Sequence, residues 1–171
     1  PSVLYSILQV IYLAKEEILI TTRQGVKLIP GASGMQELAG LSHLQSASIV
    51  QAFSTLTEEI DFLIVDLAAG ISPSVMTFLG ACQRRFIVVK DDPSSIADAY
   101  GTIKVMSQEM KLDEIYLLPN MVESQSAGWK LYNRINDVCV RFLGQPVQYL
   151  TSIESDEMVL TALKKYQSVL E

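Results

Sequence analysis

The sequence predicts an α/β fold in which a mainly parallel sheet is covered by helices on both faces, giving three layers. Short apolar runs alternate along the chain with helical patterns, and this alternation is typical of right-handed crossover units. Three of the runs, at residues 62–65, 86–89 and 115–118, are continuously apolar, which indicates strands buried on both faces. No repeat, charge run or Pro/Ser-rich linker divides the 171 residues, so we expect a single domain over residues 1–171.

Five apolar runs are the predicted strands of this sheet. Their short length distinguishes them from the longer segments with helical periodicity. The predicted strands are Val26–Ile29, Ile60–Asp66, Phe86–Val89, Ile115–Leu118 and Val147–Thr151.

The stretches between these runs carry apolar residues at helical spacing. Helix starts are marked by a capping residue at Ser42, and by a cap followed by proline at Ser72-Pro73 and Asp92-Pro93. The helix after Ser42 is predicted over Leu44–Thr57, and two further helices are predicted over Gln125–Leu143 and Asp156–Leu170.

An uncharged apolar run from Val3 to Ala14 also has helical spacing. It is shorter than the roughly 20 apolar residues that span a membrane. We therefore expect a buried helix here, and association with a membrane through this helix is the less favoured alternative.

The composition excludes several classes of protein. With 49% hydrophobic and 19% charged residues, the chain can bury enough apolar surface to fold, so disordered and low-complexity classes are excluded. The formal net charge of −6 makes nucleic acid a poor partner, because a phosphate backbone attracts the opposite charge. Cys82, Cys139 and one histidine predict neither a disulfide framework nor a metal cluster, and they favour a reducing, cytoplasmic setting.

In open parallel sheets, ligands bind beyond the carboxyl ends of the strands, so the strand ends are the candidate sites. The run Ile60–Asp66 ends in Asp66, and small residues and Gly70 follow it. An aspartate there could hold the shell of a magnesium ion, and the glycine would let the backbone approach a terminal phosphate. A capped strand end beside a turn glycine is an equally good interpretation of this spacing.

Asn120 follows the strand predicted at Ile115–Leu118. Its amide has donor and acceptor groups and could read the edge of a purine. From the spacing alone, an ordinary Asx turn is the favoured interpretation.

The sequence contains no phosphate-binding loop. No segment matches G-x-x-x-x-G-K-[ST], and the stretch Gly31–Gly34, which lacks the lysine and hydroxyl residue of that motif, is predicted to be a tight turn. Without those backbone amides and that lysine, a triphosphate loses its main cradle, so the chain as given is not expected to hydrolyse ATP.

Several segments, taken in order, resemble one known family. The patterns D-x-A-A-G-I-S and D/E-P-x-[SA]-I-x-D-A-Y at this separation are the most specific of them. The segments are Gly25–Gly34, Leu38–Ser42, Asp61–Ser72, Asp92–Tyr100, Asn120-Met121 and Arg141–Leu143. In this order they resemble the MinD/ParA class of P-loop ATPases, and most closely its flagellar number regulators of the FlhG/FleN type.

The resemblance implies a P-loop NTPase-like fold and a regulator of flagellar number or placement that uses ATP and Mg. It places Asp66, Ala69 and Gly70 in the Walker B and switch region, where Asp66 would contact the Mg shell indirectly. The family's phosphate loop and first strand would precede Pro1, and its amphipathic membrane helix would follow Glu171. The chain is therefore expected to be an incomplete domain of this family and inactive alone.

The resemblance also implies nucleotide-binding residues. Asn120 matches the asparagine that contacts adenine, and the stretch Ile153 to Asp156 matches a family loop, I-P-x-D, that borders the base. Two positions depart from the family pattern, since Glu154 replaces the loop proline and Pro119 replaces a small residue. These departures favour an alternative function, a non-enzymatic protein-interaction module of the same fold with a degenerate nucleotide pocket.

The implied partners are a second copy in a homodimer and other proteins of flagellar assembly or its transcriptional control, with no direct contact to nucleic acid. The implied location is cytoplasmic, with peripheral association at the inner face of the cell membrane for the complete protein. Loss of a strand from the middle of such a sheet leaves its neighbours unpaired and apolar surface bare. We therefore expect the chain by itself to self-associate.

Overall fold

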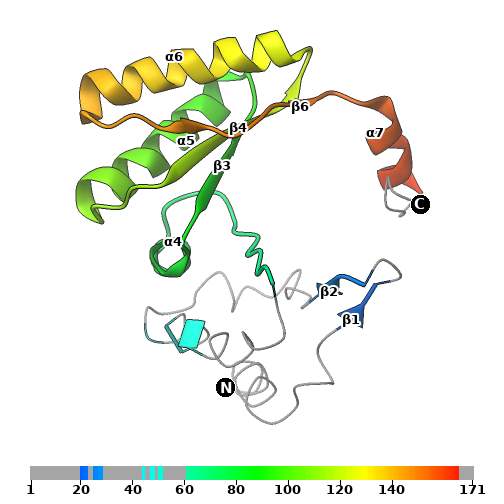
Figure 1. The fold of residues 1–171 in the computed structure, drawn as a ribbon, viewed down its shortest axis with the longest axis horizontal. Coiled ribbons are helices and arrows are strands. Elements are labelled where there is room, and N and C mark those ends of the chain that lie inside the picture. Colours follow the sequence, from blue (N-terminus) through cyan, green and yellow to red (C-terminus); the bar gives the residue numbers. More distant parts are fainter. Residues whose placement is uncertain are drawn as a thin grey trace. The chain divides into compact units, whose positions relative to one another are not determined.

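The computed structural model describes residues 20–22, 25–28, 44, 47–48, 50–51 and 61–165. The predictions for the helix at residues 3–14, the turn at residues 31–34, the cap at Ser42 and the last helix beyond residue 165 lie outside these residues. The chain divides into two compact units, a first one of residues 1–68 with 72–81 and a second one of residues 69–71 with 82–171. Figure 1 shows the described elements with their labels.

The second unit contains a parallel sheet (Figure 1). β3 (Arg85–Val89), β4 (Ile115–Val122) and β5 (Gln148–Tyr149) lie in that order, and both neighbouring pairs are parallel. A further strand, β6 (Ile153–Glu154), pairs in parallel with the carboxyl end of β4. The strands predicted around residues 86–89, 115–118 and 147–151 are confirmed, and so is the parallel arrangement.

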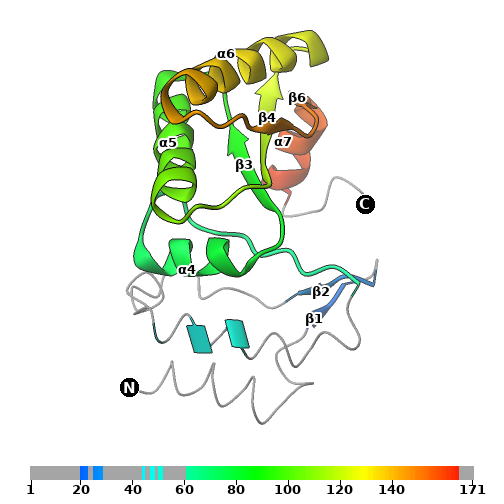
Figure 2. The ribbon, with the colours of Figure 1, turned by 60° about the vertical axis from the view of Figure 1, so that its left-hand side comes forward.

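Two helices connect these strands and pack on one face of the sheet. α5 (Pro93–Lys104) leads from β3 to β4, and α6 (Gln125–Leu143) leads from β4 to β5. Because the strands are neighbours in chain order, two right-handed crossovers place both helices on the same face. The helices also contact each other, and Figure 2 shows them together beside β3 and β4. α6 has the bounds that the sequence predicted.

Asp92 fixes the start of α5. Its carboxylate accepts a hydrogen bond from the Ser95 backbone N–H at 2.8 Å, and Pro93 follows in the first turn, as predicted. The hydrogen bonds from the Ser95 backbone and the Ser94 hydroxyl hold the pKa of Asp92 below its ordinary value. The helix continues as a π-helical turn, η2 (Val105–Glu109), before the chain enters β4.

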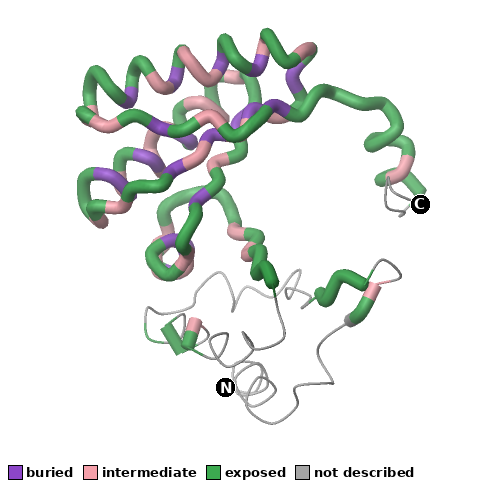
Figure 3. Tube along the Cα trace, in the orientation of Figure 1, coloured by how far each residue is buried: buried purple, intermediate pink, exposed green. Residues whose placement is uncertain are grey.

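The core of this unit lies between the sheet and the two helices. Alternate side chains of β3 and β4 point into it, and Figure 3 shows buried positions spaced along the strands and helices. Burying an aliphatic side chain of this kind contributes about 1.5–3 kcal/mol to stability. The buried residues include Val89, Ile103, Met106, Ile115, Leu117, Leu131, Ile135 and Cys139.

The opposite face of the sheet is open among the described residues of this unit. Phe86 and Val88, which alternate with the buried residues of β3, are 48% and 55% exposed. Among the described residues of this unit, helices therefore cover one face of the sheet, the face on which α5 and α6 pack. The expectation of self-association through bare apolar surface stays a prediction.

The first unit contains a two-stranded antiparallel hairpin. β1 (Ile20–Thr21) pairs with β2 (Lys27–Leu28), with Ile20 opposite Leu28. The strand predicted at residues 26–29 therefore exists, but its partner is a hairpin neighbour and not a strand of the parallel sheet.

The first unit also contains helix α4 (Pro73–Ala81), which begins where the Ser72-Pro73 pattern predicts. The Ser72 backbone carbonyl accepts a hydrogen bond from the Met76 N–H at 3.0 Å. The described residues of the helix predicted at residues 44–57 are all helical: Leu44, Ala47, Ser48, Val50 and Gln51.

One strand prediction is wrong. Residues 61–68 form neither strand nor helix, and Phe62 and Ile64 are 88% and 89% exposed. A strand forms only where a neighbouring strand takes up its backbone hydrogen bonds, and no described segment pairs with these residues. The segment has the composition of a buried strand, but the described part of the chain contains no strand that pairs with it.

The last described element is helix α7 (Glu157–Lys164), which begins after Asp156 as predicted. Its apolar residues Met158, Leu160 and Leu163 are exposed. Among the helices that the structure describes, none is long and apolar enough to cross a membrane.

Candidate functional site

Asn120 lies inside β4 and not in a loop after it. The strand continues to Val122, and its register against β6 shifts between these two residues, where Met121 adopts a φ of 56°. The Asn120 Oδ1 atom accepts a hydrogen bond from the Met121 backbone N–H at 2.9 Å. This bond is not the Asx turn that the spacing favoured, because an Asx turn reaches two residues along the chain. The Asn120 Nδ2 group donates to no described residue.

β6 brings Ile153 beside Asn120. The two residues are register partners across the β4–β6 pair, although the whole of α6 and β5 separates them in the sequence. The Ser155 backbone N–H extends this pairing with a hydrogen bond of 2.8 Å to the Val122 carbonyl. Two of the residues predicted to border a nucleotide base therefore lie together at the carboxyl end of β4.

A second set of contacts ties the β6 segment (residues 152–155) to the first turn of α6. The Gln125 backbone N–H donates to Glu154 Oε1 at 2.9 Å, and the Gln125 side chain donates from Nε2 to the Ser152 carbonyl at 3.1 Å. Sequence reasoning missed Gln125 and Ser152 as parts of this site. The only local signal was the start of α6, where the Ser124 hydroxyl accepts from the Ala127 N–H.

α6 approaches the β6 segment so closely that only glycine fits at position 128. A Cβ atom added to Gly128 would lie 1.9 Å from Ser152 Oγ and 2.5 Å from Ser152 Cβ. The Ser152 hydroxyl also lies 2.9 Å from the Tyr149 hydroxyl, in hydrogen-bond contact. The β6 segment is thus held from the β4 side and from the α6 side.

Three aromatic side chains lie next to this contact. The Trp129 ring centroid is 4.9 Å from that of Tyr149, edge to face, and 5.1 Å from that of Tyr132. The Tyr132 hydroxyl donates to the Val147 carbonyl at 2.9 Å. Burial, and to a lesser degree the negative charge of Asp137, raises the pKa of Tyr132. The sequence predicted Trp129 and Tyr132 as residues of α6, but their contact with Tyr149 is a tertiary feature.

Asp156, the third predicted nucleotide residue, caps α7. Its carboxylate accepts a hydrogen bond from the Met158 backbone N–H at 2.7 Å. Asp156 is exposed and follows the β6 segment directly, so it is close in sequence to Ile153 and Glu154.

The predicted switch residues lie in the irregular segment that precedes α4. Asp66, Ala69 and Gly70 are exposed, and Gly70 adopts a φ of 111°, which residues with a Cβ rarely adopt. Asp66 belongs to the first compact unit, whereas Ala69, Gly70 and Asn120 belong to the second. The Walker B role of Asp66 and its indirect contact with Mg stay predictions.

Within the described parts of the chain, no three His, Cys, Asp or Glu side chains lie close enough to hold a metal ion. Cys139 is buried in the core, and burial raises the pKa of its thiol to about 11. The thiol is therefore protonated at neutral pH and does not supply a nucleophile.

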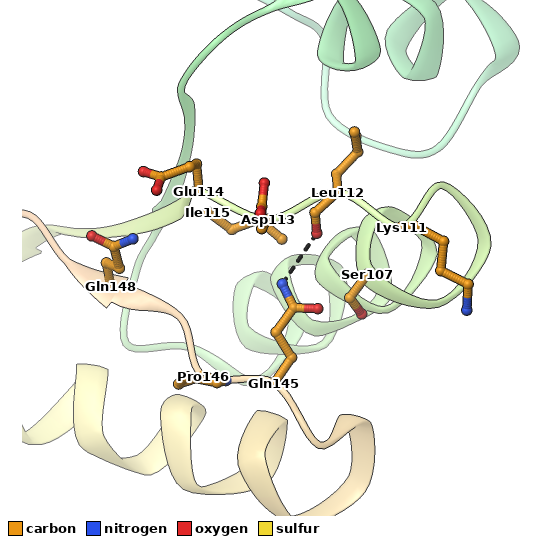
Figure 4. Close-up of a pocket in the computed structure, with 9 residues that line it drawn as sticks. All are labelled: Ser107, Lys111, Leu112, Asp113, Glu114, Ile115, Gln145, Pro146 and Gln148. Atoms are coloured by element: carbon orange, nitrogen blue, oxygen red, sulfur yellow. Dashed lines mark hydrogen bonds between the residues drawn. The ribbon is translucent and has the colours of Figure 1, made fainter.

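A hollow of about 430 Å³ lies at the amino ends of β4 and β5, at the other end of the strand from Asn120. Figure 4 shows its lining, including the hydrogen bond of 3.1 Å from Gln145 Nε2 to the Leu112 carbonyl. None of the predicted site residues lines it. Ligands of open parallel sheets bind at the carboxyl ends of the strands, so the Asn120–Ile153 edge remains the candidate site.

Comparison with curated proteins finds two relatives. The chain is 39% identical over 155 residues to the antiactivator FleN of Pseudomonas aeruginosa, and the match covers 91% of this chain and 55% of FleN. It is 32% identical over 152 residues to the flagellum site-determining protein YlxH of Helicobacter pylori, covering 88% of this chain and 50% of YlxH. The chain thus spans about half the length of the curated relatives it matches. No protein-family model matches it.

Among solved structures, the ParA family ATPase of Chlorobium tepidum is similar, with a TM-score of 0.69 and 18% sequence identity. The match covers 98% of this chain and 66% of that protein. The parallel sheet and its crossover helices therefore have the P-loop NTPase-like α/β fold of ParA-family ATPases. Together with the relatives FleN and YlxH, this fold confirms the family that the motifs indicated. The chain belongs to the MinD/ParA class, and within it to the FlhG/FleN type.

Proposed function

We propose that the chain is part of a regulator of flagellar number or placement and that it binds an adenine nucleotide at the carboxyl end of β4. The names of FleN and YlxH support the flagellar role. The observation that carries the nucleotide site is the pairing of Asn120 with Ile153, which brings together two residues from distant parts of the sequence.

The chemistry of this edge suits a planar base. Asn120 Oδ1 is occupied by the Met121 N–H, which leaves Nδ2 as a donor for a ring nitrogen of the base. Ile153 is 47% exposed and offers an apolar surface for the face of the ring. Asp156 begins α7 directly after the β6 segment and would border the base from the other side.

ATP and Mg are the proposed ligands of the complete protein. Gly70 fits a role beside a terminal phosphate, because its φ of 111° and the open space where a Cβ would lie would let the backbone approach an anion. Asp66 would hold the Mg shell indirectly, and Ala69 would lie in the switch. Magnesium would neutralise charge on the phosphates when bound.

The proposed partners are a second copy of the protein and other proteins of flagellar assembly or its transcriptional control. The proposed location is cytoplasmic, with peripheral association at the membrane for the complete protein. One observation favours the alternative of a non-enzymatic interaction module. Apolar residues on β3 and α7, such as Phe86, Val88 and Leu163, are exposed among the described residues.

Nucleotide titration tests the proposal. We expect the complete protein to bind ATP in preference to GTP with Mg present, and Asn120→Ala in that protein to weaken ATP binding by about two- to tenfold, the value of one hydrogen bond. Asp66→Asn should reduce the dependence on Mg and leave the preference for adenine unchanged. Equal binding by the wild type and Asn120→Ala would contradict the site. Failure of the complete wild-type protein to bind any nucleotide would favour the interaction module.

A further inference from the structure

We propose that Glu154 is a positioning residue for the nucleotide site. Its carboxylate ties the β6 segment to the first turn of α6 and so holds Ile153 beside Asn120. This inference rests on the proposed function of the Asn120–Ile153 edge.

The pairing between β4 and β6 needs support from a second side. β6 contains two residues, and the ladder that joins it to β4 is interrupted at Met121, where the register shifts. So short a strand at an irregular site has few backbone hydrogen bonds to fix the position of Ile153. Contacts from α6 supply the additional support.

Glu154 is suited to that task by the chemistry of a helix start. The first backbone N–H groups of a helix have no partner within the helix, and a negative charge is favoured next to them. The Ser124 hydroxyl accepts from the Ala127 N–H, and the Glu154 carboxylate accepts from the Gln125 N–H. Gln125 returns a hydrogen bond from Nε2 to the Ser152 carbonyl. Gln125 and the β6 segment are therefore joined by two hydrogen bonds.

The departure of Glu154 from the family pattern thus has a structural explanation. Proline in the family loop has no side-chain acceptor for the Gln125 N–H, whereas Glu154 provides one. The departure does not by itself argue against a base site. In this chain the rigid proline is replaced by Glu154, whose side-chain hydrogen bond to the Gln125 N–H holds the same segment.

The chain contains its own reporter for the position of the β6 segment. Trp129 is the single tryptophan, and its ring lies against Tyr149, whose hydroxyl contacts Ser152. Displacement of the β6 segment should therefore change the fluorescence of Trp129.

The experiment compares Glu154→Ala, Glu154→Gln and a control, Glu157→Ala, by titration of the complete protein with ATP and Mg and by Trp129 emission of the chain. Glu154→Ala is expected to weaken ATP binding by about three- to tenfold and to shift the emission to longer wavelength. Glu154→Gln keeps an acceptor for the Gln125 N–H and should bind close to the wild type. Glu157→Ala removes the same charge from an exposed site on α7 and should not weaken binding.

A second variant removes the other partner. Gln125 is the first residue of α6, where proline is well tolerated, so Gln125→Pro removes both hydrogen bonds to the β6 segment and preserves the helix. It should weaken ATP binding at least as much as Glu154→Ala does, because Glu154→Ala removes only one of the two hydrogen bonds. The double variant should lose little more than Gln125→Pro alone, because Gln125→Pro already removes the hydrogen bond that Glu154 accepts.

The proposal is overturned if Glu154→Ala and Gln125→Pro bind ATP as the wild type does, whether or not Trp129 emission shifts. It is also overturned if Glu154→Gln and Glu157→Ala lose as much affinity as Glu154→Ala, since the effect would then be one of charge. If the complete wild-type protein does not bind ATP, the proposed base site fails and the positioning role fails with it. Normal wild-type binding with unaffected variants contradicts the positioning role alone.

Discussion

The ends of two predicted strands carry the two parts of the predicted site, and their structures differ. The edge near Asn120 lies in a parallel sheet, paired with β3 and β5 and with Ile153 of β6. The segment before Asp66 is as apolar as β3 or β4, but it is irregular and exposed among the described residues. Apolar composition alone therefore does not make a strand.

The physical reason for this difference is that a strand has no hydrogen bonds of its own. A helix satisfies its backbone groups within one segment, whereas a strand depends on neighbours that lie elsewhere in the sequence. α5 and α6 consequently form where the sequence predicts them, and residues 61–66 do not form a strand without a described neighbour. Three predictions test this comparison.

The largest effect should be a difference in the free energy of unfolding between two truncations. One removes a core side chain from β4, and the other removes an exposed side chain from residues 61–66. Leu117 is fully buried in β4, so Leu117→Ala should lower the free energy of unfolding by about 2–5 kcal/mol. Ile64 is 89% exposed, so Ile64→Ala should change it by less than about 0.5 kcal/mol. Urea denaturation followed by Trp129 fluorescence measures both. A large loss with Ile64→Ala would show that residues 61–66 are buried in a sheet.

A smaller effect should separate two helical glycines. Gly128→Ala places a methyl group on Ser152, so it should destabilise the protein by about 1–3 kcal/mol and displace the β6 segment. Gly101→Ala is the matched control in α5, with open space at its Cβ, and it should stabilise the protein by about 0.5–1 kcal/mol. Thermal unfolding measures both variants. If both substitutions stabilise the protein, α6 does not approach the β6 segment as closely as described.

The smallest effect concerns the Asp92 cap, which is a local feature. Hydrogen bonds lower the pKa of Asp92 in the folded protein, so its contribution is fully present above the ordinary aspartate pKa of 3.8 and is lost as the pH falls further. Asp92→Asn keeps an acceptor for the Ser95 N–H but does not titrate. The difference in unfolding free energy between wild type and variant should shrink as the pH is lowered below 3.8. A difference that stays constant with pH would contradict this role of the carboxylate.

Much of the fold could be predicted because its signals are local. Asp92-Pro93 marks the start of α5, Ser72-Pro73 marks the start of α4, and apolar spacing gives the bounds of α6. The apolar run before Asn120 was predicted correctly as a strand, but its continuation to Val122 was not, because pairing with β6 extends it.

The candidate site was predictable only in part. The family motifs single out Asn120 and Ile153, and the structure brings these residues together. The contribution of Glu154, Gln125 and Gly128 could not be predicted, because their contacts join the first turn of α6 to a segment that follows it by the length of the helix and β5.

The sequence by itself determined the helices, their starts, the apolar runs and the family motifs, because each depends on residues within a few positions of one another. Only the tertiary structure decided which apolar run became a strand, which face of the sheet was covered and which side chains hold β6 to α6. Those outcomes depend on neighbours far along the chain, and strand pairing and close packing are possible only where such neighbours meet.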